Sequence, residues 1–94
     1  MKSFNLKIVT PEKEIFSDQV VSVIVPGAAG SFGILANHAP LVSHIKKGIV
    51  EIKRSHGKEI VIEVEEGYAK VKNNEMILLV TSAEMEAEIP DLSQ

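Results

Sequence analysis

The chain has 94 residues, of which 45% are hydrophobic and 4% aromatic, with a net charge of −3 and no cysteine. This length allows a single domain, whose own hydrophobic core is small for independent stability. The acidic balance and the lack of a basic cluster give nucleic-acid binding little support. No apolar run approaches the roughly 20 residues of a membrane-spanning helix, so the sequence predicts a soluble domain or a peripheral member of a membrane complex.

Strand patterns recur at intervals of about 8–12 residues with turn signals between them, as in a β-sandwich or barrel. Phe4, Leu6 and Ile8 alternate with polar residues, and Asn73–Asn74 tolerates the left-handed backbone of a tight hairpin. The predicted strands are residues 4–8, 14–16, 20–25, 31–35, 41–45, 49–53, 59–65, 68–72 and 76–80. We therefore expect an all-β fold, a two-layer β-sandwich of short, mostly antiparallel strands.

Two of these strands, residues 20–25 and 76–80, are apolar at almost every position. A small sandwich buries only the inner face of each sheet. The outer faces of these strands must therefore lie under loops or be covered by another protein.

The last segment differs in kind. Residues 82–89 are rich in helix formers, with Ser82 as a candidate N-cap, but Pro90 disfavours a helix at Ile89. A helix this short is not stable without packing. The sequence thus predicts a sandwich over residues 1–82 and a short, frayed C-terminal tail over residues 83–94.

Residues 25–41 contain three glycines, Gly27, Gly30 and Gly33, followed by Asn37-His38-Ala39-Pro40. The G-x-x-G-x-x-G spacing is neither the dinucleotide fingerprint nor a phosphate loop. The segment is apolar and carries almost no acid, base or nucleophile, which favours a contact surface over a catalytic pocket.

Other polar residues form no catalytic or metal-binding pattern. His38, His44 and His56 lack the spacing of a zinc site. His38 is either a loop histidine that bonds backbone carbonyls or a partner contact. Glu63 and Glu65 share one strand face and are expected to be solvated. The sequence predicts no catalytic residue, no metal and no cofactor.

Lys72 supports one alternative function, that of a small cofactor-carrier domain. Small all-β carrier domains of the lipoyl and biotinyl type attach their cofactor to a lysine in a tight turn, and Lys72 precedes the Asn73–Asn74 turn. The flanking residues expected of either carrier, methionines or a preceding acid, are absent. A generic adaptor domain remains a further alternative.

The chain resembles the epsilon subunit of F-type ATP synthases, in particular its N-terminal β-sandwich domain, over nearly its whole length. The segments that carry the resemblance are L-K-I-V-T-P-E-K-E-I-F-S (6–17), V-P-G-A-A-G-S-F-G-I-L-A-N-H-A-P-L (25–41), K-K-G-I-V-E-I (46–52) and E-E-G-Y-A-K-V-K-N-N-E-M-I-L-L (65–79). The first two segments together are the most specific.

The resemblance implies a non-catalytic rotor subunit that couples the gamma subunit to the membrane ring of c subunits during proton-driven ATP synthesis. It implies that Thr10, His38 and Ser43 lie towards gamma. It implies that the loop of Ala28, Ala29, Gly30, Ser31 and Phe32 faces the c ring. The catalytic alpha and beta subunits would belong to the same complex, peripheral to the cytoplasmic face of an energy-transducing membrane without direct insertion.

The chain departs from the family pattern in three places. Many relatives carry an acidic residue where Ser31 stands, and many carry glycine where Asn37 stands. Typical relatives also continue into a helical hairpin that can inhibit ATP hydrolysis and, in some members, binds ATP. This sequence stops at Gln94, so neither inhibition by a hairpin nor ATP binding is expected from it.

Overall fold

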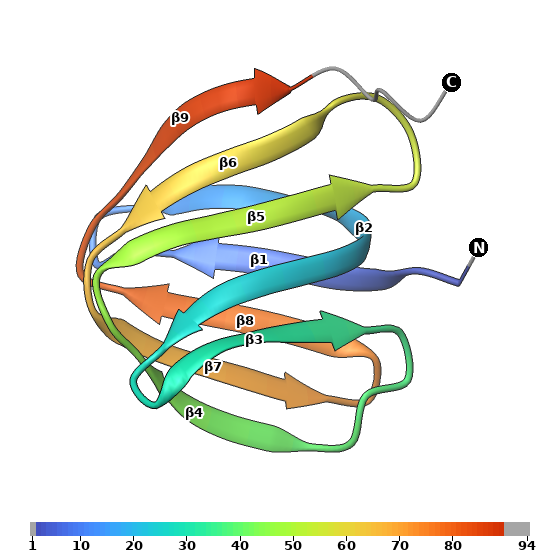
Figure 1. Ribbon diagram of the computed structural model, residues 1–94, viewed down its shortest axis with the longest axis horizontal. Helices are drawn as coiled ribbons and strands as arrows, with labels where there is room; N and C mark the ends of the chain where they lie inside the picture. Colours follow the sequence, from blue (N-terminus) through green and yellow to red (C-terminus); the bar gives the residue numbers. More distant parts are fainter. Residues whose placement is uncertain (1, 90–94) are drawn as a thin grey trace.

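The computed structural model describes residues 2–89, and these residues form nine strands and no helix (Figure 1). The strands are β1 (Phe4–Val9), β2 (Glu14–Gly27), β3 (Gly30–Leu35), β4 (Leu41–Ile45), β5 (Gly48–Arg54), β6 (Glu59–Val64), β7 (Gly67–Lys72), β8 (Glu75–Val80) and β9 (Ala83–Ile89). The all-β prediction is confirmed. Most predicted strands appear with small differences at their ends.

The strands form two layers that share β2. One layer has the order β1-β8-β7-β4, and the other contains β2, β5, β6 and β9, with β3 paired to β2. Strand β2 also pairs with β1, so it joins the layers through the backbone. Among the described strands only β1 and β8 pair in parallel. The two-layer, mostly antiparallel sandwich is therefore confirmed.

Strand β2 is one long strand of 14 residues, although its sequence predicts two pieces. The polar Ser17-Asp18-Gln19 interrupts the apolar pattern, but it pairs with Lys7, Leu6 and Asn5 of β1. Residues Val20–Ile24 then pair with β5, and Ser22–Gly27 pair with β3. Pairing with a neighbouring strand, rather than local hydrophobicity, therefore keeps the polar stretch extended.

The hydrophobic core lies between the two layers. Alternation along β1 buries Phe4, Leu6 and Ile8, and alternation along β8 buries Met76 and Leu78. The opposite layer contributes the buried aliphatic side chains of Val23, Val25, Val50, Ile52, Ile60, Ile62 and Val64. Full burial of one such side chain stabilises the fold by roughly 1.5–3 kcal/mol.

Residues 83–89 of the predicted C-terminal tail form a strand rather than a helix or a frayed segment. Residues 83–89 form β9, which runs antiparallel to β6 with Val64 opposite Ala83 and Glu63 opposite Glu84. The helix-forming pattern of this segment was therefore misleading. Pairing satisfies the outer backbone groups of β6, whereas a short isolated helix gains no packing. Residues 90–94 of the predicted tail lie outside the described residues.

Candidate partner-binding surfaces

The β2–β3 turn and the start of β3 contain the residues that the resemblance assigns to the c ring, namely Ala28, Ala29, Gly30, Ser31 and Phe32. The first four are exposed, and the Phe32 side chain packs against the core. The Ala28 N–H donates to the carbonyl oxygen of His44 at 3.0 Å, and the Lys46 N–H donates to that of Pro26 at 2.9 Å. The turn is thus an uncharged, exposed tip that backbone hydrogen bonds hold against β4.

The three residues assigned to gamma do not form one cluster. Thr10 ends β1 beside Val80, because β1 and β8 run parallel. His38 lies in the β3–β4 loop, and the neighbouring Asn37 bonds the turn at the other end of β8. Ser43 lies within β4, between these ends. The structure therefore places Thr10 and His38 at opposite ends of the sandwich.

Each of these three side chains makes a local contact. Thr10 is 6% exposed, and its hydroxyl donates to the carbonyl oxygen of Lys13 at 3.2 Å. The His38 Nδ1 lies 2.6 Å from the carbonyl oxygen of Ala39, so Nδ1–H donates there. The Ser43 hydroxyl lies 3.5 Å from the carbonyl oxygen of His44. The expected bond from His38 to a backbone carbonyl is confirmed, and a partner contact of this half-buried ring stays a prediction.

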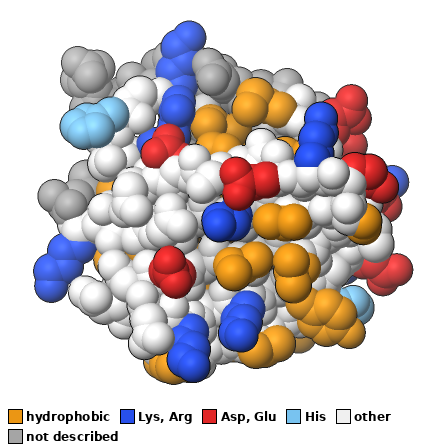
Figure 2. Space-filling view, turned by 180° about the vertical axis from the view of Figure 1, so that it is seen from behind, with side chains coloured by type: hydrophobic (Ala, Val, Ile, Leu, Met, Phe, Trp, Pro, Cys, Tyr) orange, Lys and Arg blue, Asp and Glu red, His pale blue; other side chains and the backbone are white. Residues whose placement is uncertain are grey.

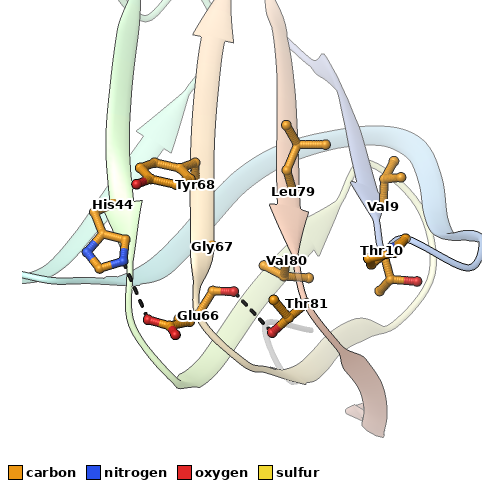
Figure 3. Close-up of a pocket in the computed structure, with 10 residues that line it drawn as sticks. Val9, Thr10, His44, Glu66, Gly67, Tyr68, Leu79, Val80 and Thr81 are labelled. Atoms are coloured by element: carbon orange, nitrogen blue, oxygen red, sulfur yellow. Dashed lines mark hydrogen bonds and ion pairs between the residues drawn. The ribbon is translucent and has the colours of Figure 1, made fainter.

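A depression of about 630 Å³ lies on the outer face of the β1-β8-β7-β4 layer, at the Thr10 end (Figure 3). We call it the Tyr68 depression. Its floor is one side chain from each strand, because Val9 pairs with Leu79, Leu79 with Tyr68, and Tyr68 with His44. The rest of its lining is Thr10, Pro11, Glu66, Gly67, Val80 and Thr81.

The outer face of this layer carries several exposed apolar side chains beside charged ones such as Lys70, Lys72 and Glu75. Leu79 is 52% exposed, Tyr68 57% and Val42 69%. Figure 2 shows hydrophobic side chains gathered towards one end of this face, with charged groups around them. Ile24 of the other layer is also exposed. Within residues 2–89, therefore, no loop fully covers these outward-facing side chains of β2 and β8, and cover by another protein stays a prediction.

A carboxylate and an imidazole lie on one side of the Tyr68 depression. The Nε2 atom of His44 lies 3.8 Å from a carboxylate oxygen of Glu66. The His44 ring stacks obliquely on Tyr68, with centroids 5.3 Å apart. The Thr81 N–H and hydroxyl both donate to the carbonyl oxygen of Glu66, at 3.2 and 3.4 Å. The Glu66 backbone is thus fixed, while its carboxylate faces solvent.

The other residues that the sequence analysis considered, for cofactor attachment or metal binding, do not come together in one site. Lys72 is exposed at the end of β7, directly before the Asn73–Asn74 turn, as expected. Within residues 2–89, no group of three or more His, Asp or Glu side chains is arranged to hold a metal ion. In the same range no helix is long and apolar enough to cross a membrane.

Sequence reasoning did not find the row of Val9, Leu79, Tyr68 and His44. Its members come from four segments, and only strand pairing brings them together. The one sequence feature that pointed to this row was the apolar character of both faces of residues 76–80. It indicated an outward-facing apolar side chain at Leu79, but it did not indicate which residues lie beside Leu79.

Asn74 fastens the His38 loop to the rest of the fold. Asn73 and Asn74 have φ angles of 52° and 62°, which confirms the predicted left-handed turn. The Asn74 side chain accepts a hydrogen bond from the Asn37 N–H at 2.7 Å and donates one to the carbonyl oxygen of Ser3 at 2.9 Å. One side chain thus ties together the N-terminus, the β3–β4 loop and the β7–β8 turn.

Replacing Asn74 with glycine is therefore expected to lower the free energy of unfolding by about 1–2 kcal/mol, because glycine keeps the positive φ but loses both bonds. Urea unfolding followed by circular dichroism measures the loss. The control is Asn73→Gly, which alters the same turn and leaves these two bonds intact. Equal stability of the two variants would mean that the Asn74 side chain does not fasten the loop.

The geometry defines a class of protein: a small β-sandwich that presents an exposed uncharged turn and an apolar sheet face, both suited to contact with other proteins. The sequence model of the family described as "ATP synthase, Delta/Epsilon chain, beta-sandwich domain" matches residues 3–86. The chain belongs to this family, and the resemblance inferred from its motifs is confirmed.

Individual relatives agree with this assignment. The chain is 43% identical over 83 residues to the ATP synthase epsilon chain of Campylobacter concisus, covering 88% of this chain and 64% of that relative. It is 42% identical to the ATP synthase epsilon chain of Desulforamulus reducens, covering 88% and 62%. The chain therefore spans less than two thirds of the length of these relatives.

Solved structures share the fold. A chain of the Euglena gracilis mitochondrial ATP synthase, in a cryo-EM structure of OSCP, F1 and c-ring, superposes with a TM-score of 0.83 at 21% identity, covering 88% of this chain and 53% of that chain. A chain of the Tetrahymena thermophila mitochondrial ATP synthase central stalk and c-ring gives a TM-score of 0.75 at 16% identity, covering 88% and 66%.

Proposed function

We propose that the chain acts as a non-catalytic subunit of the rotor central stalk in an F-type ATP synthase, where it couples the gamma subunit to the c ring during proton-driven synthesis. The observation that carries the proposal is the family match over residues 3–86. The two structural neighbours come from assemblies that contain a c-ring and, for the Tetrahymena structure, the central stalk, which supports the same role. The family match does not support the carrier alternative at Lys72.

Two surfaces have the properties that this role needs. The β2–β3 turn with the start of β3, residues 28–32, would contact the c ring, and backbone hydrogen bonds fix the position of this tip. Thr10 and His38, at opposite ends of the sandwich, and Ser43 between them would contact gamma. The complex, with its alpha and beta subunits, would hold the chain peripherally at the cytoplasmic face of the membrane.

The test of partner identity is a pull-down from native membranes with the chain as bait, followed by mass spectrometry. Recovery of gamma with the c ring and the catalytic subunits is the expected result. A His38→Asp bait should recover less gamma, because it places a carboxylate at the half-buried position 38. Enrichment of a biotin or lipoate ligase without gamma would replace the stalk role by the carrier role.

A bulky charged side chain at the tip of the β2–β3 turn should weaken the contact with the c ring and leave the contact with gamma unchanged. We expect Ala29→Arg to weaken binding to purified c ring at least tenfold while gamma binding stays within twofold, because Ala29 is exposed at the tip. Binding of the full chain to detergent-solubilised c ring measures the effect. The matched control is Ser55→Arg, on the exposed β5–β6 loop, away from this turn. Equal ring binding by both variants would remove the turn from the proposed ring contact.

A further inference from the structure

Phe32 differs from the other four residues that the resemblance assigns to the c ring. Those four, residues 28–31, are exposed and form the tip of the turn, whereas Phe32 is half-buried and packs against the core. Phe32 pairs with Val25 across the β2–β3 hairpin, and the Val25 side chain is fully buried. Directly opposite residues of an antiparallel pair lie on the same face. The phenyl group of Phe32 is therefore turned towards the core rather than outward from the tip.

The phenyl group lies directly over Gly27, the last residue of β2. A Cβ atom at Gly27 would lie 2.7 Å from Cε1 and 2.8 Å from Cδ1 of Phe32, and 2.6 Å from the carbonyl oxygen of Gly30. All three separations are shorter than the distance at which such atoms attract each other. Only glycine at position 27 therefore lets the phenyl group reach the backbone at the base of the tip.

The tip depends on such contacts because its turn does not favour a hairpin by itself. The two-residue turns that match the twist of paired strands have a positive φ at their first central residue. Neither Ala28 nor Ala29, the two residues between the strands, has a positive φ, and a φ of 132° falls on Gly30 instead. The tip is thus held by its tertiary contacts, namely the bond from the Ala28 N–H to His44 and the phenyl group of Phe32.

We propose that Phe32 is a positioning residue for the c-ring contact: its phenyl group holds residues 28–31 in the orientation in which the c ring binds them, and it does not touch the c ring itself. This inference rests on the proposed stalk function and refines it, because it divides residues 28–32 into an exposed contact and an inward support. A segment that already has its bound conformation binds without the cost of being ordered. Loss of the support lowers the apparent affinity by the factor by which the binding-competent fraction falls.

The test measures the association and dissociation rate constants, kon and koff, of the full chain on immobilised, detergent-solubilised c ring by biolayer interferometry. Phe32→Ala should lower kon about tenfold and leave koff within about twofold, because fewer chains have a competent tip but the bound contacts are unchanged. Loss of a direct contact would instead raise koff. The matched control is Phe16→Ala, which removes another half-buried phenyl group packed against the core, at the opposite end of β2. It should keep both rate constants within about twofold.

A second variant disturbs the support without removing any exposed group of the tip. Gly27→Ala places a Cβ atom where the phenyl group lies, so a similar fall in kon is expected. Its control is Gly33→Ala, whose Cβ atom would have its nearest neighbour at 3.8 Å. In the free chain, Phe32→Ala should also speed hydrogen exchange of the Ala28 N–H about tenfold by NMR, and Phe16→Ala should not, because only the former releases the tip.

The outcomes separate the inference from the function. If the original chain does not bind the c ring, the proposed ring contact fails and the inference fails with it. If it binds, and Phe32→Ala keeps its kon or loses affinity through koff, only the positioning role is wrong. An equal fall in kon for Phe16→Ala would refute it as well, because general loss of packing would then explain the effect. Should Phe32→Ala fail to fold by circular dichroism, Phe32→Leu replaces it, with a kon about threefold lower expected and an unchanged kon contradicting the proposal.

Discussion

Replacing Gly67 with alanine is expected to lower the free energy of unfolding by about 3 kcal/mol or more. Gly67 begins β7 and pairs with Val80 of β8 and Ile45 of β4. A Cβ atom there would overlap the carbonyl oxygen of Leu79 and lie 2.7 Å from the Val80 Cα. These are backbone atoms of a paired strand, so the clash is relieved only by separating strands.

Thermal and urea unfolding of the purified chain measure this loss. In a domain of this size about 3 kcal/mol corresponds to a fall in Tm of more than about 10 °C. The matched control is Gly33→Ala, because a Cβ at Gly33 has its nearest neighbour at 3.8 Å, an ordinary contact. Stability of Gly67→Ala within about 0.5 kcal/mol of the control would show that β7 and β8 are not this close.

Removing β9 is expected to lower the free energy of unfolding by about 2–4 kcal/mol, from several backbone hydrogen bonds less the entropy regained by the freed segment. β9 pairs with β6 from Val64–Ala83 to Glu59–Ile89, and Ala83 packs against the core. Without β9, the outer edge of β6 is open to solvent. The experiment compares a chain that ends at Ser82 with one that ends at Ile89.

The same comparison tests the predicted domain boundary. If residues 83–89 act only as a tail, the two shortened chains will have the same unfolding midpoint in urea. If β9 belongs to the sandwich, the chain that ends at Ser82 will unfold at lower denaturant and will tend to associate through the open edge of β6. Sedimentation of both chains at the same concentration detects this association.

The sequence predicts those parts of the fold whose pattern lies within a single short segment of the chain. Alternation in residues 4–8 and 59–65 identified β1 and β6, because the pleat places successive side chains on opposite faces. The Asn73–Asn74 turn followed from the tolerance of asparagine for positive φ. The same local motifs carried the resemblance to the epsilon family, which the family match confirmed.

Features that depend on partners distant in the chain could not be predicted in this way. Residues 83–89 have helix-forming composition, yet the open edge of β6 makes them a strand. Ser17-Asp18-Gln19 has no strand pattern, yet β1 pairs with it. In both cases tertiary hydrogen bonds outweigh intrinsic propensities of a few tenths of a kcal/mol per residue.

The sequence by itself thus determined most of the strands, the Asn73–Asn74 turn and the family, because each is encoded in neighbouring residues. Only the tertiary structure decided which side chains share a surface. It placed Thr10 and His38 at opposite ends, and it aligned Leu79 and Tyr68 with their neighbours into one depression. The physical reason is that register between strands is set by packing of the whole core, which no single segment specifies.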